Sequence, residues 1–123
     1  MAGEKNFENK VKKFLEENGC YYIKHFSNAF TKSGIPDILA SVNGYFVGIE
    51  VKASNGKPSP LQIYNLQKID ESGGYAVLLY PDDFETFKTF IKALIDFELF
   101  VENVHYKHYL CLKERWMEFA NKL

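Results

Sequence analysis

The chain has 123 residues, 46% of them hydrophobic, which is enough for one domain with a single core. It has no run of 18 apolar residues that would span a membrane and no apolar segment typical of a secretory signal, so we expect a cytoplasmic protein with no membrane partner. The net charge of −1 is not that of a protein that coats nucleic acid through bulk positive charge.

The first predicted elements are a helix over residues 4–18 and a strand over residues 20–26. The helix is predicted by apolar side chains at one-face spacing, with a glycine at position 19 as its stop: Phe7, Val11, Phe14 and Leu15. The strand is favoured by Tyr21, Tyr22 and Ile23. A polar loop over residues 27–34 follows, and Pro36 indicates where the next strand begins.

Residues 37–52 predict a hairpin, because Asn43-Gly44 lies between two β-prone runs. A two-residue turn there sets the register, so that Val42 faces Tyr45 and Asp37 faces Glu50. Because side chains alternate along a strand, one face of the hairpin is apolar or aromatic. The other face carries Asp37, Glu50 and Lys52 at one end.

The second half of the chain predicts three helices and a strand. Ser59 and Pro60 begin a helix that ends at Gly73-Gly74, and residues 75–80 form a buried strand. Asp82 followed by Glu85 predicts the capped start of a third helix, and a fourth runs from Tyr106. Residues 97–104 are unassigned, although their β-prone residues allow a short strand.

The element order α-β-β-β-α-β followed by helices predicts an α/β fold with a mixed central sheet flanked by helices. The helical crossover makes the third and fourth strands parallel. We expect residues 1–123 to form one domain, with a core over about 4–95 and a C-terminal helical extension over about 96–123.

Asp37 and Glu50 are predicted to face each other across the hairpin, where like charges repel by about 3 kcal/mol at an effective dielectric constant near 20. A divalent cation would offset this, and Mg²⁺ prefers one or two carboxylates plus waters and phosphate. Lys52, on the same face, would bring positive charge to a scissile phosphate. The alternative is that Asp37 begins a solvated strand, Glu50 pairs with Lys52, and nothing binds. Against it, Glu50 interrupts an apolar strand, where an unpartnered charge is costly.

Three segments resemble one family, namely Ser33-Gly34-Ile35-Pro36-Asp37-Ile38-Leu39, Gly44 to Ala53, and Ser59-Pro60-Leu61-Gln62. They are similar to the VRR-NUC branch of the PD-(D/E)XK nucleases, in particular its compact phage and Holliday-junction-resolvase-like members. The resemblance covers residues 4–94 and implies a restriction-endonuclease-like αβββαβ core. It also implies the cytoplasm of a bacterium or a phage-infected host.

The resemblance further implies a site that binds Mg²⁺, or Mn²⁺ in its place. Its ligands would be Asp37, Glu50 and the main-chain carbonyl of Val51, with Lys52 assisting the attacking water. Glu8 would complete the metal site, or alternatively form only an i,i+4 pair with Lys12. Gln62 would point into the site, or alternatively form only a capping box with Ser59.

Basic and aromatic side chains in the first half are candidate nucleic-acid contacts. The resemblance suggests Lys24 and Tyr64, and the charge distribution suggests further candidates: Lys10, Lys13, His25, Lys32 and Lys57. Each of these lysines can instead be an ordinary solvated side chain.

The expected function is that of a metal-dependent DNA endonuclease specific for branched DNA such as a Holliday junction. We expect a homodimer, because paired incisions need two sites related by a two-fold axis. Three alternatives remain: a nuclease acting on duplex or single-stranded DNA in repair or restriction, a non-cleaving DNA-binding protein on the same fold, and a protein with no nucleic-acid role.

Overall fold

A computed structural model describes residues 2–26 and 33–123 of the chain. The helices are α1 (Ala2–Glu17), α2 (Pro60–Glu71), α3 (Phe84–Ile95), α4 (Phe97–Val101) and α5 (Val104–Ala120). The strands are β1 (Tyr21–Lys24), β2 (Ile38–Val42), β3 (Tyr45–Val51) and β4 (Tyr75–Leu79), and a short 3-10 turn covers Pro81–Asp83. Within the described residues, no helix has the length and apolar character needed to cross a membrane.

The four strands form one mixed sheet in the order β1-β2-β3-β4. The first two pairings are antiparallel, and β3 pairs with β4 in parallel, as the helical crossover predicted. Asn43 and Gly44 turn the hairpin with positive φ angles of 51° and 86°. The predicted register is confirmed, since Val42 pairs with Tyr45 and Ile38 with Ile49.

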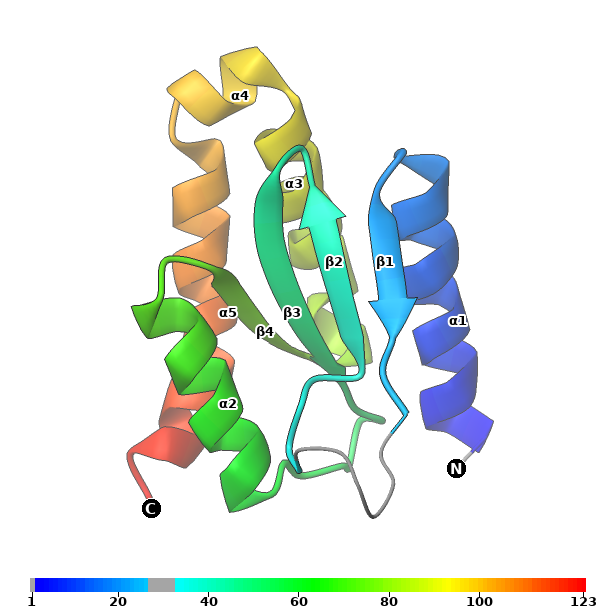
Figure 1. Cartoon of the computed structure of the whole chain (residues 1–123), viewed down its shortest axis with the longest axis vertical. Coiled ribbons are helices and arrows are strands. Elements are labelled where there is room, and N and C mark those ends of the chain that lie inside the picture. Colours follow the sequence, from blue (N-terminus) through cyan, green and yellow to red (C-terminus); the bar gives the residue numbers. More distant parts are fainter. Residues whose placement is uncertain (1, 27–32) are drawn as a thin grey trace.

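The sheet separates two packing layers (Figure 1). The predicted apolar face of the hairpin is buried in a core that includes side chains of α1 and α3, among them Val11, Leu15, Phe87 and Ile91. On the opposite face, α2 packs against β4 through Ile63 and Leu66. Helix α5 contributes to both layers, with Tyr109 and Leu112 in the first and Trp116 in the second.

Helix α5 also provides hydrogen-bond partners for backbone groups at the outer edge of β4. The backbone N–H of Ala76 donates to the hydroxyl of Tyr109 at 3.1 Å, and the carbonyl of Ala76 accepts from the indole N–H of Trp116 at 2.9 Å. An exposed strand edge is a template for pairing with another chain, and these two side chains occupy it instead. Helix α5, within the predicted C-terminal extension, is therefore part of the core.

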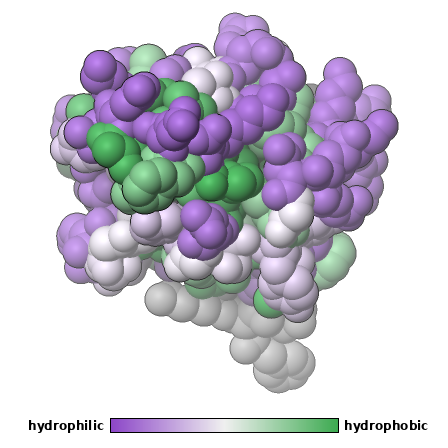
Figure 2. All heavy atoms as spheres, turned by 90° about the horizontal axis from the view of Figure 1, so that it is seen from above, coloured by the Kyte–Doolittle hydropathy of each residue, from purple (hydrophilic) through white to green (hydrophobic). Residues whose placement is uncertain are grey.

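Figure 2 views the end of the molecule at which α4 lies. Hydrophobic side chains gather on the α4 side of this view, while the side of α1 is hydrophilic. Ile95, the last residue of α3, is an exposed hydrophobic side chain, and so are Phe97 and Val101 of α4.

The structure decides one segment that the sequence left open and overturns one local prediction. Residues 97–101, unassigned from the sequence, are helical, because Asp96 caps them by accepting from the N–H groups of Glu98 and Leu99. The predicted Asp82 cap is absent, since Asp82 lies in the 3-10 turn and α3 begins at Phe84 without a side-chain cap. The neighbouring Asp83 is bound through both carboxylate oxygens by Arg115 of α5.

Candidate active site

The loop before β2 brings Asp37 to the end of the sheet. Gly34 has a φ of 82°, and a Cβ there would lie 2.6 Å from the backbone of Leu61, so a larger residue would push the loop away from α2. Asn65 is buried and donates to the carbonyls of Ser33 and Leu61. The glycine of the G-x-P-D motif thus permits a close contact that holds the aspartate in place.

Asp37 is not a member of the β2–β3 ladder, and this corrects the predicted direct pairing with Glu50. The ladder ends at the pair of Ile38 and Ile49. At Asp37 the backbone carbonyl accepts from the N–H of His25 at 2.8 Å, and carboxylate Oδ2 accepts from the N–H of Val51 at 3.0 Å. The side chain therefore binds the end of β3 and still lies beside Glu50, whose pKa it affects.

Glu50 is a buried carboxylate near the end of the interior strand β3, with 2% of its surface exposed. Burial raises its pKa to about 8, and the nearby charge of Asp37 adds to this shift, which Lys52 only partly offsets. Its Oε1 atom is buried and has no hydrogen-bond partner among the described residues. Such an atom is costly unless something binds it.

Two side chains contact the other oxygen of Glu50. The ammonium of Lys52 lies 3.4 Å from Oε2, and the amide nitrogen of Gln62 donates to the same atom at 3.1 Å. Gln62 also accepts from the backbone N–H of Ser59 and completes a capping box there. Both interpretations of Gln62 therefore hold, because the same side chain completes the capping box of α2 and donates to Glu50.

Glu8 and Lys24 approach Asp37 from the side of α1. Lys24 pairs with Ile38, so its side chain leaves the sheet on the apolar face, where α1 packs. Its ammonium lies 2.8 Å from Glu8 Oε1 and 3.5 Å from Asp37 Oδ1. Glu8 also forms the i,i+4 pair with Lys12, at 2.9 Å.

The oxygen atoms gathered at Asp37 and Glu50 are of the kind that Mg²⁺ prefers as ligands. Asp37 and Glu50 supply two carboxylates, the peptide of Val51 lies against Asp37, and Glu50 Oε1 lacks a partner within the described chain. Three acids do not converge here, since no group of three His, Cys, Asp or Glu side chains in the described residues is arranged to hold a metal. Glu8 remains separated from the pair, with Lys24 between it and Asp37.

The candidate nucleic-acid contacts are dispersed. Lys24 lies at the site and Lys57 is exposed in the loop that follows Lys52, whereas Tyr64 lies on the outer side of α2 beneath the ammonium of Lys68. Lys10 and Lys13 are exposed on α1, two and five positions from Glu8, which turns them away from it. His25 lies next to Lys24 in the chain and is partly exposed. Lys32 falls outside the described residues.

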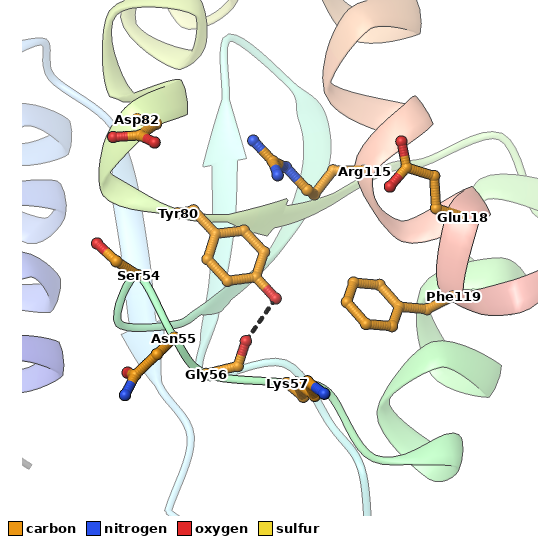
Figure 3. Close-up of a pocket in the computed structure, with 9 residues that line it drawn as sticks. All are labelled: Ser54, Asn55, Gly56, Lys57, Tyr80, Asp82, Arg115, Glu118 and Phe119. Atoms are coloured by element: carbon orange, nitrogen blue, oxygen red, sulfur yellow. Dashed lines mark hydrogen bonds between the residues drawn. The ribbon is translucent and has the colours of Figure 1, made fainter.

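A pocket of about 260 Å³ lies beside the site, between the loop after Lys52 and α5 (Figure 3). The hydroxyl of Tyr80 donates to the carbonyl of Gly56 at 2.8 Å, and the guanidinium of Arg115 lies 5.1 Å from the Tyr80 ring. Lys57 and Arg115 are balanced by Asp82 and Glu118 along the lining, so the pocket lacks the positive charge that a phosphate site needs. Its lining does not include Asp37, Glu50 or Lys52.

Asn65 is a positioning residue that the sequence interpretation missed. Its signal was a polar side chain on the inner side of a predicted helix, between Ile63 and Leu66, where an apolar residue is the rule. A buried amide needs partners, and here it finds the carbonyls of the loop that carries Asp37.

Comparison with known proteins places these residues in a family. The family model of the archaeal Holliday junction resolvases (Hjc) matches residues 2–77, which is more than half of the chain. The chain belongs to the archaeal Holliday junction resolvase family. The match spans α1 to β4 and includes every residue of the site, from Glu8 to Gln62.

The resolvase family is a nuclease family, and the fold agrees with this. A solved structure described as a VRR_NUC domain is similar to the chain, with a TM-score of 0.51 and 23% identity, over 60% of this chain and 80% of that one. The predicted VRR-NUC-like α/β fold is thereby confirmed. No curated protein matches the chain significantly. Residues 78–123, which include α5, lie outside the matched resolvase segment.

Proposed function

We propose that this resolvase-family protein is a Mg²⁺-dependent endodeoxyribonuclease that cleaves branched DNA, with a four-way junction as its substrate class. The family membership supports the substrate class. The observation that carries the metal-dependent chemistry is Glu50, which is almost completely buried, lies beside Asp37 and has one oxygen without a hydrogen-bond partner among the described residues. A structural carboxylate would be expected to have that oxygen bound.

The ion would be held by Asp37, Glu50 and the carbonyl of Val51. Mn²⁺ can replace Mg²⁺ at such a site. When bound, the metal supplies Lewis-acid activation of the phosphate and its attacking water. The Val51 N–H and Gln62 fix the orientation of the two carboxylates before substrate arrives. Such preorganised donors and acceptors are the main source of catalysis in charged reactions.

Lys52 would act on the substrate directly. Its ammonium lies 3.4 Å from Glu50. The N–H groups that do not face Glu50 would donate hydrogen bonds to a phosphate oxygen and to the attacking water. Hydrolysis adds the water oxygen to phosphorus and releases the 3′ oxygen, so negative charge develops on the phosphoryl group. A cation held at this position stabilises that charge more in the transition state than in the ground state.

We further propose that the protein acts as a homodimer, because a four-way junction has two-fold symmetry and symmetric incision needs two equivalent sites. Tyr21 and Ile23 are 71% and 53% exposed, and Phe46 is 47% exposed. Through their cross-strand pairs these three lie on the same face of the sheet as Glu50. An apolar surface of this kind supports association. Sedimentation equilibrium, with and without junction DNA, measures the mass.

The proposal is tested by cleavage of a labelled four-way junction, with linear duplex and single-stranded DNA of the same sequences as controls. Reactions contain Mg²⁺, Mn²⁺ or EDTA. The variants are Asp37→Asn and Lys52→Ala, and the matched control is Lys88→Ala, which removes an equal charge from α3 on the opposite side of the sheet.

We expect metal-dependent cutting of the junction by the wild type and Lys88→Ala. For Asp37→Asn and Lys52→Ala we expect a loss of at least about 100-fold. If duplex or single-stranded DNA is cut faster than the junction, the proposed substrate class is wrong and those DNAs are the substrates. Binding without cutting, in any metal, would overturn the enzymatic proposal and favour a non-cleaving DNA-binding protein.

A further inference from the structure

Lys24 lies between two carboxylates at the edge of the proposed metal site. Its ammonium is 2.8 Å from Oε1 of Glu8 and 3.5 Å from Oδ1 of Asp37. The side chain is only 20% exposed, and its charge is retained because both acids hold it in place. Lys24 is the group that joins α1 to the aspartate.

The two sides of Asp37 differ in their supply of positive charge. On the α1 side, Glu8 is buried and each of its oxygens lies within 3 Å of an ammonium, from Lys24 and from Lys12. On the other side, Glu50 has Lys52 and Gln62 at one oxygen and nothing from the described residues at Oε1. Glu8 is thus paired with two ammonium groups, although its Oε2 makes no hydrogen bond among the described residues, whereas no described cation lies against Oε1 of Glu50.

We propose that the ammonium of Lys24 takes the place of a second divalent cation between Glu8 and Asp37, so that the site binds a single metal ion. This inference rests on the proposed metal site at Asp37 and Glu50. Lys24 acts through the two acids that it contacts and is a positioning residue. In this proposal Glu8 anchors Lys24 and is not a metal ligand.

The physical reason is competition between like charges for the same oxygens. A divalent ion on the α1 side would need Glu8 Oε1 and Asp37 Oδ1, which are the atoms nearest to the ammonium. The ion and the ammonium would repel each other at that distance in a partly buried setting, where screening is weak. Removing the ammonium leaves a buried acid and an adjacent acid without that partner, and a cation then becomes favourable.

The experiment counts bound Mn²⁺ by electron paramagnetic resonance of the free ion, without DNA and without a cleavage assay. The proteins are the wild type, Lys24→Met, Lys24→Gln, Lys24→Arg and the double variant Glu8→Gln with Lys24→Met. We expect one tightly bound ion per protomer in the wild type and in Lys24→Arg, which keeps the positive charge. We expect two in Lys24→Met and Lys24→Gln.

The double variant separates this role from a general loosening of the site. It lacks both the ammonium and the acid that would hold a second ion, so its count should return to one. Lys24→Gln serves if Lys24→Met does not fold, because its amide can still donate to Glu8.

Each result has one meaning. Two ions in the wild type, or one ion in both neutral variants, would overturn the role of Lys24 and leave the proposed nuclease site intact. No bound ion in the wild type would overturn the proposed metal site and the inference with it. A double variant that binds two ions would show that Glu8 is not the ligand that Lys24 replaces, which also overturns the inference.

Discussion

The two faces of the β2–β3 hairpin are built from the same residues in alternation and have opposite properties. On one face Ile38, Val47 and Ile49 are completely buried against α1 and α3. The other face carries Glu50 and, at its end, Asp37 and Lys52, with charges only partly balanced. The contrast shows that burial of the apolar face stabilises the fold, while the buried charge on the other face destabilises it. Both faces belong to β3, a strand of seven residues.

The largest effect on stability is expected on the apolar face. Ile49→Ala should lower the free energy of unfolding by about 2 to 5 kcal/mol, because it leaves a cavity in a completely buried layer. The matched control is Leu39→Ala, one strand away on the charged face and partly exposed, with an expected loss of about 1 kcal/mol. Urea denaturation measures both. Equal losses would break the contrast between the faces.

The second prediction concerns the charged face and its dependence on pH. Glu50 has a pKa of about 8 in the folded protein against 4.5 as its ordinary value, so the folded state holds the proton more tightly. This contribution to stability is complete below about pH 4.5 and is lost as the pH rises through about 8.

Glu50→Gln removes the proton equilibrium and keeps the shape of the side chain. In EDTA we expect the wild type to lose stability relative to Glu50→Gln between about pH 5 and about pH 9, and the variant to be the more stable protein at the upper end. Denaturant midpoints across this range measure it, with Glu85→Gln on the exposed surface of α3 as control. Parallel pH profiles for the wild type and Glu50→Gln would contradict the assignment.

The smallest stability effect is expected at Gln62, where a helix cap and the site share one side chain. Gln62→Ala removes the acceptor for the Ser59 N–H and the donor to Glu50. It should cost about 1 kcal/mol of stability and lower cleavage at least about 10-fold. Gln62→Glu keeps the capping acceptor and places a second acid beside Glu50, so it should preserve the cap and still impair cleavage. Unchanged cleavage in both variants would show that Gln62 serves the helix alone.

The local features of the site could be predicted from short segments of sequence. Asn43-Gly44 and the period of two set the register and placed Glu50 and Lys52 on one face, and Ser59-Pro60 marked the start of α2. Such features depend on residues close together in the chain, so local rules apply to them. Residues 97–101 could not be assigned from the sequence, because their β propensity competes with the cap at Asp96, and in the structure the cap sets a helix.

By itself the sequence determined the order of the elements, the pairing of β2 with β3, and the presence of a carboxylate pair with a lysine in an apolar strand. Only the tertiary structure decided how distant side chains complete these features. Lys24 bridges α1 to Asp37, Asn65 of α2 holds the loop before β2, and Tyr109 and Trp116 close the edge of β4. These contacts join residues far apart in the chain, and their partners are set by the packing of whole elements, which no local pattern encodes.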